Sequence, residues 1–231
     1  MARMKHTLAN VIVVGLAFVM GSSQADAKDG DGEGLRVVLG LGPSIPSESF
    51  ADVYGLVGAS REQLWNAFDA SAELGIHATG RLRFGLSDQL SIVASASYHR
   101  FAGIEQTATL ENGQRLQLGS VTNVIPIGVG FQYFVVRSIV SPYVIGDVSF
   151  TTTSVTVNEP SSSFASLLRQ EGIELSPRTG RFGASVGLGV ELGLKIVDPF
   201  IEFRYTGANV VGRAESEVVR TFYTVTLGVT L

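Results

Sequence analysis

Charged residues of both signs stand at alternating positions within apolar stretches of this 231-residue chain. Their spacing follows the period of a β-strand, in which every second side chain points to the same side. Charges gathered on one side of a sheet either neutralise each other as ion pairs in an enclosed space or line a path for solutes. We favour an ion-pair network over a gated small pore for Arg36, Arg81, Arg83, Asp147, Glu191, Lys195, Glu202 and Arg204.

Two histidines and a serine accompany these charges on the same predicted face. His77, His99 and Ser97 have side chains found in hydrolytic sites, but a catalytic triad also needs an orienting group and an oxyanion hole. We therefore expect polar filling and no enzyme, with a lipid-modifying enzyme as the least favoured alternative. The chain has no cysteine, which excludes disulfides and thiolate metal sites, and we expect neither a metal nor a cofactor.

The elements that position these residues are strands with a period of two. In "GRFGASVGLGVELGLK", residues 180–195, apolar side chains alternate with glycine, serine and charge. The same alternation predicts eight strands, with patterned residues in 35–41, 73–86, 90–99, 125–133, 144–151, 180–195, 201–205 and 220–231. Short turns alternate with long connections, a pattern typical of outer-membrane barrels. The long connections are 43–71, 103–118, 155–179 and 207–217.

The first residues of the chain predict export. Arg3 and Lys5 precede an apolar stretch that ends at Met20, and Ala25 and Ala27 form a small-residue cleavage signal. We expect residues 1–27 to be a cleaved signal peptide, 28–34 a short periplasmic spacer and 35–231 one β-barrel domain. After residue 20 no apolar run approaches the roughly 20 residues that a membrane helix needs. The net charge of −4 argues against nucleic acid as a partner.

Glycine indicates which face of the strands points inward. A soluble barrel also alternates, with its apolar face inside, but its outer face would carry lysine, glutamate and threonine where this chain has glycine. A narrow, filled lumen needs small residues, and charges of opposite sign can then pair within it. Across the turn before Pro199 we expect Glu191 opposite Arg204 or, in a register shifted by two, Lys195 opposite Glu202.

Aromatic residues of the apolar face fall near both predicted ends of the strands. Those toward the short turns are Phe84, Phe131 and Tyr133. Those toward the long loops are Tyr98, Phe182, Tyr205 and Tyr223. Two aromatic girdles about a bilayer apart are typical of membrane barrels.

The predicted fold is therefore an all-β, eight-stranded antiparallel up-and-down transmembrane β-barrel with long external loops and short periplasmic turns. In lipid, only a closed barrel pairs every backbone group of a set of strands. Two variations stay open. Ten strands would result if a long connection hid another pair, and a turn at 111–114 would make a tall hairpin that stands above the membrane.

Two central segments resemble a known family. "NVIPIGVGFQYF" (123–134) and "PYVIGDVSF" (142–150) are similar to small outer-membrane β-barrels, which include the OmpA transmembrane domain and OmpX-like and opacity-type surface proteins. The resemblance extends over about 34–231 and implies a location in the outer membrane of a Gram-negative bacterium, in contact with its lipid. The terminal "YTVTLGVTL" resembles the strand that the barrel-assembly machinery binds, although it ends in Leu231 where the family has phenylalanine.

Two of the long connections contain helical patterns. In "SREQLWNAFDAS" (60–71), Ser60 and Gln63 fit a capping box, and Leu64, Trp65 and Phe68 share a helical face. Lids on the rim and a contact surface for an extracellular partner fit such segments equally well. We expect a membrane anchor that presents surface loops, a structural and interaction protein. The alternative is a channel for small solutes or hydrophobic compounds.

Overall fold

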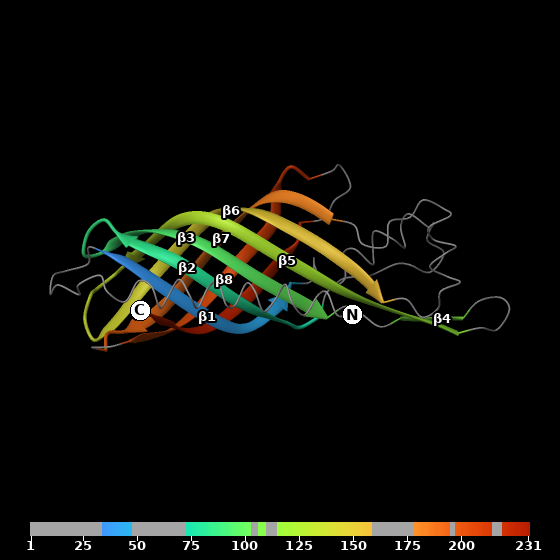
Figure 1. Cartoon of the computed structure of the whole chain (residues 1–231), viewed down its shortest axis with the longest axis horizontal. Coiled ribbons are helices and arrows are strands. Elements are labelled where there is room, and N and C mark those ends of the chain that lie inside the picture. The colour runs from blue at the N-terminus through green and yellow to red at the C-terminus, as the bar shows by residue number, and fades with distance from the viewer. Residues whose placement is uncertain are drawn as a thin grey trace.

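The computed structural model describes residues 34–47, 73–102, 106–109, 115–158, 178–194, 197–213 and 219–231. These residues form a closed antiparallel barrel of eight strands, with a ninth, short strand attached (Figure 1). The wall consists of β1 (Leu35–Pro46), β2 (Gly75–Gly85), β3 (Leu90–Ala102), β5 (Arg115–Phe134), β6 (Val140–Asn158), β7 (Arg178–Leu192), β8 (Asp198–Val211) and β9 (Thr221–Thr230). Within these ranges no helix is long and apolar enough to cross a membrane.

The wall closes where the first strand meets the last. β1 pairs with β9 through contacts such as Val38 with Thr230, and the backbones of Val37 and Leu231 exchange hydrogen bonds of 3.2 and 2.8 Å. β3 pairs directly with β5, so that each wall strand lies between two antiparallel neighbours. A closed ladder of this kind pairs the strand backbones without water. The predicted eight-stranded barrel is confirmed.

The short strand β4 (Gln106–Thr109) stands outside the wall and pairs only with residues 115–118 of β5. Figure 1 shows this hairpin projecting beyond the barrel, at the end where the long connections lie. The expected loop at 103–118 is therefore partly wrong, and the hairpin around 111–114 is the better description.

Alternation separates the two faces of the wall. Outward side chains such as Ile127, Val186 and Leu227 are 61, 61 and 58% exposed, whereas the inward positions of β2 are buried. Inward glycines allow neighbouring backbones to approach. A Cβ at Gly42 would lie 1.8 Å from the Val225 carbonyl oxygen. This close approach is the physical reason for the glycine-rich inner face.

The β7–β8 ladder contains an irregularity near the long connections. Phe182 pairs with Val211, but Ala184 already pairs with Gly207, so β8 carries extra residues there. Asn209 is buried as a result, and its Oδ1 accepts a 2.6 Å hydrogen bond from the Arg220 backbone N–H. β8 thus continues to Val211, where the sequence predicted a loop from 207 onward. The two extra residues interrupt the inside–outside alternation near the end of β8, which hides this part of the strand from a period-two search.

Candidate functional site

The lumen side nearest the short turns is filled by a buried ion pair. Nη1 and Nη2 of Arg83 donate to Oε2 and Oε1 of Glu191 at 2.7 and 3.1 Å, and both side chains are at most 4% exposed. Thr230 Oγ1 donates to Glu191 Oε2 at 2.8 Å, and Arg137 Nη1 lies 4.0 Å from Oε1. The pair joins β2 to β7 across the lumen with the bidentate geometry that suits guanidinium and carboxylate.

A larger network fills the next level of the lumen. Arg81 donates to both oxygens of Glu202 at 2.7 and 2.6 Å, and Tyr143 Oη donates to Glu202 Oε2 at 2.9 Å. Arg204 Nε donates to Glu202 Oε1 at 3.1 Å, and its Nη1 donates to Asp147. Three strands, β2, β6 and β8, thus contribute to one group of two positive and two negative charges. Mutual neutralisation of this kind is what lets charges stay buried.

Aromatic rings pack against the guanidinium groups of two lumen arginines. Cζ of Arg81 lies 5.7 Å from the ring centre of Phe200, and Cζ of Arg83 lies 5.2 Å from that of Phe134. An inward glycine makes room for another aromatic ring, that of Tyr143. A Cβ at Gly189 would lie 2.5 Å from Oη of Tyr143, the ring that reaches Glu202. The small inward residues therefore fit the bulky ones opposite them.

Two further arginines lie at the short-turn mouth. Arg36 Nη1 donates to Asp198 Oδ2 at 2.8 Å in a partly exposed pair. The guanidinium of Arg137 lies 3.6 Å from the ring centre of Phe134 and donates from Nε to the Asp88 carbonyl oxygen at 2.8 Å. Burial, together with the nearby positive charge of Arg83, lowers the pKa of Arg137. Both side chains therefore have partners at this end of the barrel.

A small polar cavity of about 20 Å³ lies between the Glu202 network and His99. All four carboxylate oxygens of Glu202 and Asp147 already accept hydrogen bonds. Nε of Arg81 and Nη2 of Arg204 are buried without a partner in the described part of the chain. A space of this size accommodates about one water molecule, which would accept from such donors. It is far too small for a solute path.

Two histidines share one hydroxyl group on the loop side of this cavity. Ser44 Oγ lies 3.2 Å from Nδ1 of His77 and 3.0 Å from Nδ1 of His99. His77 Nε2 lies 2.9 Å from Thr226 Oγ1. Because a hydroxyl carries one proton, Ser44 can donate to only one of the two imidazoles, so at least one Nδ1–H donates to Ser44. Ser97 donates to Thr79 Oγ1 at 2.8 Å instead, so the serine beside the histidines is Ser44.

An apolar cluster fills the lumen beyond the histidines, toward the long connections. It consists of Phe101, Val124, Ala208 and Phe222, each at most 1% exposed. The rings of Phe101 and Phe222 meet edge to face at 5.3 Å, and His99 packs on Phe222 at 4.7 Å. Charged, polar and apolar levels therefore follow one another along the lumen.

The charged residues of β7 and β8 are paired in a different register from the two that the sequence suggested. Glu191 is paired in register with Phe200, Arg204 with Gly187 and Glu202 with Gly189. Both registers expected for the β7–β8 pair are wrong. Asp198 sets the turn instead, because its Oδ1 accepts the Leu194 N–H at 2.8 Å. The carboxylates of Glu191 and Glu202 instead pair with arginines of β2, across the lumen.

Four predicted residues lie outside the described part of the chain: Lys195, Leu64, Trp65 and Phe68. The sequence reasoning also missed three participants, Asp198, Tyr143 and Ser44. The last two have the inward parity of their strands, so the period-two pattern contained the signal. Asp198 is the first residue of β8, and at the start of a strand the alternation does not indicate to which face a side chain points.

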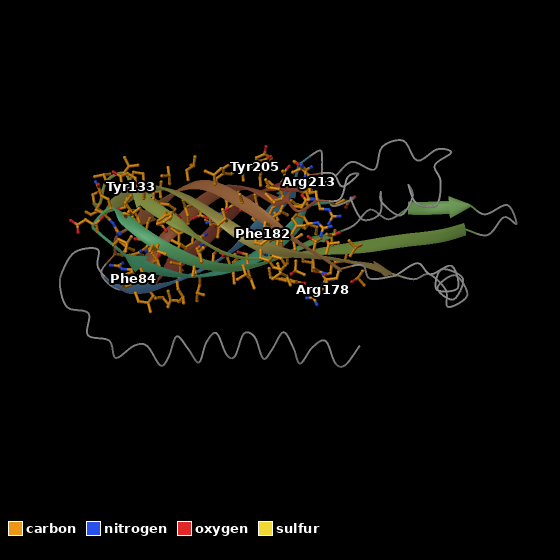
Figure 2. All side chains as sticks on the ribbon, turned by 90° about the horizontal axis from the view of Figure 1, so that it is seen from above. Phe84, Tyr133, Arg178, Phe182, Tyr205 and Arg213 are labelled. Atoms are coloured by element: carbon orange, nitrogen blue, oxygen red, sulfur yellow. The ribbon has the colours of Figure 1, made fainter. Side chains whose placement is uncertain are left out.

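Aromatic side chains mark both ends of the outward face. Figure 2 shows Phe84 and Tyr133 toward the short turns, with Phe182 and Tyr205 nearer the other end. Phe84, Tyr133 and Phe182 are 52, 44 and 59% exposed. Of the other residues predicted for the girdles, Phe131 and Tyr223 are also exposed, and Tyr98 is partly buried. The Tyr98 hydroxyl donates to Asn123 Oδ1 at 2.7 Å.

No known protein family and no curated protein matches the sequence. Among solved structures, Neisserial surface protein A (NspA) aligns with 85% of this chain and 96% of its own, at 16% identity and a TM-score of 0.51. OprG from Pseudomonas aeruginosa and Ail, the attachment invasion locus protein of Yersinia pestis, align over 87 and 86% of this chain. Their identities are 13 and 11%, and their TM-scores 0.47 and 0.43. The likeness to NspA confirms, at the level of the fold, the resemblance to small outer-membrane barrels.

Proposed function

We propose that the protein is an outer-membrane barrel that serves as an anchor and presents its long connections outside the cell. The observation that carries this proposal is the filled lumen. Ion pairs, hydroxyl groups and an apolar cluster occupy successive levels, and the cavity found between them holds about one water molecule. What remains for contact with the surroundings is the outer face and the connections at one end.

The outward face supports a place in a bilayer. Large apolar side chains such as Leu41, Ile76 and Val148 are 67, 69 and 63% exposed. A soluble protein rarely exposes a continuous apolar band of this extent. The wall strands have 10 to 20 residues, and a strand that crosses a membrane needs about 9–11.

The proposed partners follow from this placement. Outer-membrane lipid covers the apolar band, and the barrel-assembly machinery binds the terminal strand β9. An extracellular partner would bind the long connections. The proposal includes no catalytic step, since Ser44 is fully buried between its histidines.

Trypsin added to intact cells tests the proposal, with the full chain expressed in a Gram-negative host. Arg61 and Arg169 lie in connections between strand ends on the long-connection side, whereas Arg137 lies in a short turn at the opposite end. We expect cleavage at Arg61 or Arg169 in intact cells, and cleavage at Arg137 only after the cells are broken. The reverse order would contradict the proposed orientation, and protection of all three sites would contradict surface presentation.

A channel for small solutes is the alternative. The polar cavity beside Arg81 and Arg204 is the observation that favours it, because neighbouring hydroxyl groups could extend a hydrated path if the side chains moved. The apolar cluster on one side and the Arg83–Glu191 pair on the other oppose it. A conductance measurement separates the two functions.

A further inference from the structure

The ladder that closes the barrel, between β1 and β9, is interrupted at a proline. Its pairing stops after Leu41 and resumes at Ser44. Gly42 and Pro43, which lie between these residues, are not paired with β9 in this ladder, although both strands are described throughout this stretch. The backbone ladder is therefore weakened at the joint between the first and last strands of the wall.

The direction of the backbone groups explains the interruption. In an antiparallel ladder, alternate residues turn their N–H and C=O toward the same neighbour. Because Val37 and Leu231 exchange hydrogen bonds, the odd-numbered residues of β1 face β9. The register places Pro43 opposite Val225, and proline has no N–H to donate to the Val225 carbonyl. That carbonyl oxygen lies instead 1.8 Å from where a Cβ at Gly42 would be.

A histidine from the neighbouring strand crosses this gap inside the lumen. His77 of β2 is paired in register with Gly42. Its Nδ1 lies 3.2 Å from Ser44 Oγ on β1, and its Nε2 lies 2.9 Å from Thr226 Oγ1 on β9. A Cβ at Gly42 would lie 3.3 Å from His77 Cε1, so the glycine leaves room for the ring above β1. One imidazole thus joins three strands at the level of the interruption.

The β3–β5 ladder shows a similar combination on its outer side. Its pairing stops after Ala96 and resumes at His99, and Pro126 of β5 lies in the interruption. The Tyr98 hydroxyl donates to Asn123 Oδ1 at 2.7 Å and so joins the same two strands. At each of these two proline gaps, a side-chain hydrogen bond therefore connects the strands that the backbone leaves unpaired.

We propose that His77 is a clasp that holds the β1–β9 joint closed from inside, in place of the backbone hydrogen bond that Pro43 removes. An imidazole suits this role because its two nitrogens lie apart on a rigid ring, and each can bond a hydroxyl group. Both hydroxyl groups and the ring are at most 5% exposed, so water does not compete for these bonds. Without the clasp, local opening of the wall would begin at this joint.

Amide hydrogen exchange tests the clasp, followed by nuclear magnetic resonance on the refolded full chain in lipid nanodiscs. Thr226→Val removes the β9 end of the clasp with little change in shape, and His77→Phe removes both ends. In either variant we expect the amides of Val225 and Leu227, which face β1, to exchange about tenfold faster. If His77→Phe does not refold, Thr226→Val alone decides.

Two proline variants separate a clasp from simple packing. Pro43→Ala restores a backbone N–H opposite Val225, and in this background Thr226→Val should accelerate exchange by less than about twofold. Pro126→Ala makes the same chemical change at the β3–β5 joint, which is not the joint that His77 spans. In that background the increase should stay about tenfold, because the two sites are independent.

Three results would overturn the clasp. No change at Val225 and Leu227 would mean that the joint does not depend on His77. A tenfold increase in both proline backgrounds would mean that Thr226→Val only loosens packing. Equal increases at the amides of Thr224 and Gly228, which face β8, would mean that the whole barrel is destabilised. The even-numbered residues of β9 face β8 because the Arg220 carbonyl oxygen accepts the Ala208 N–H.

Discussion

The two halves of the lumen are filled by different chemistry. On the short-turn side, β2 arginines form paired hydrogen bonds with carboxylates of β7 and β8. On the long-connection side, Phe101 and Phe222 pack with Val124 and Ala208, and His99 covers them. The first half depends on charge complementarity and the second on close packing.

This difference predicts how the stability of each half should respond to substitution. Removal of one member of a buried ion pair leaves a charge without a partner, which is more unfavourable than the loss of the pair as a whole. Truncation of a ring in the apolar half leaves a cavity, with a penalty that depends on how well the neighbours relax. The predictions below change one half at a time.

Glu202→Gln should have the largest effect. It leaves the guanidinium groups of Arg81 and Arg204 with one carboxylate between them, and we expect the free energy of unfolding to fall by about 4 kcal/mol. Urea unfolding of the refolded protein in vesicles measures this change. As a control, the double substitution R81M/E202M removes charges of both signs and should be less destabilising. A double variant that is less stable than E202Q would contradict pairing between these two residues.

Phe222→Ala should destabilise the apolar half by about 3 kcal/mol, because Phe222 is fully buried against Phe101 and His99. The same unfolding assay applies, and Phe222→Leu serves as the conservative control with a smaller loss. The loss should be independent of salt concentration. A strong salt dependence would mean that this half is not held by packing.

Gly189→Ala should cost about 2 kcal/mol, because the new methyl group would overlap the Tyr143 ring and displace its hydroxyl from Glu202. Gly146→Ala is the matched control on the outer face, where the nearest atom to an added Cβ lies 3.6 Å away. The control should change stability by less than about 0.5 kcal/mol. Equal losses for the two variants would show that glycine serves the strand backbone and not the ring.

Ser44→Ala should have the smallest effect, a loss of about 1 kcal/mol, because it removes the hydroxyl shared by His77 and His99. Histidine ring signals in nuclear magnetic resonance spectra should shift for both residues in this variant. Ser97→Ala is the control, since Ser97 bonds Thr79 instead. Shifts in only one histidine would contradict the shared hydroxyl.

Sequence alternation was enough to predict the strands and most of their inward faces, because one face is apolar and the other small or polar over most of each wall strand, away from the apolar cluster. It could not predict which charges meet. Arg81 and Glu202 are separated by 121 positions and contact each other across the lumen, a distance at which strand register gives no information. The β8 bulge escaped a period-two search because its extra residues interrupt the alternation, whereas the β4 hairpin was one of the two variations that the sequence left open.

Single-channel recording in a planar bilayer tests the filled lumen most directly. The refolded chain, with its folded state checked by strand-rich circular dichroism, is added to the bilayer under voltage. We predict no discrete conductance, because the ion pairs and the apolar cluster block the lumen at separate levels. Reproducible openings that change with Arg83→Gln or Glu202→Gln would contradict the anchor function and support a channel.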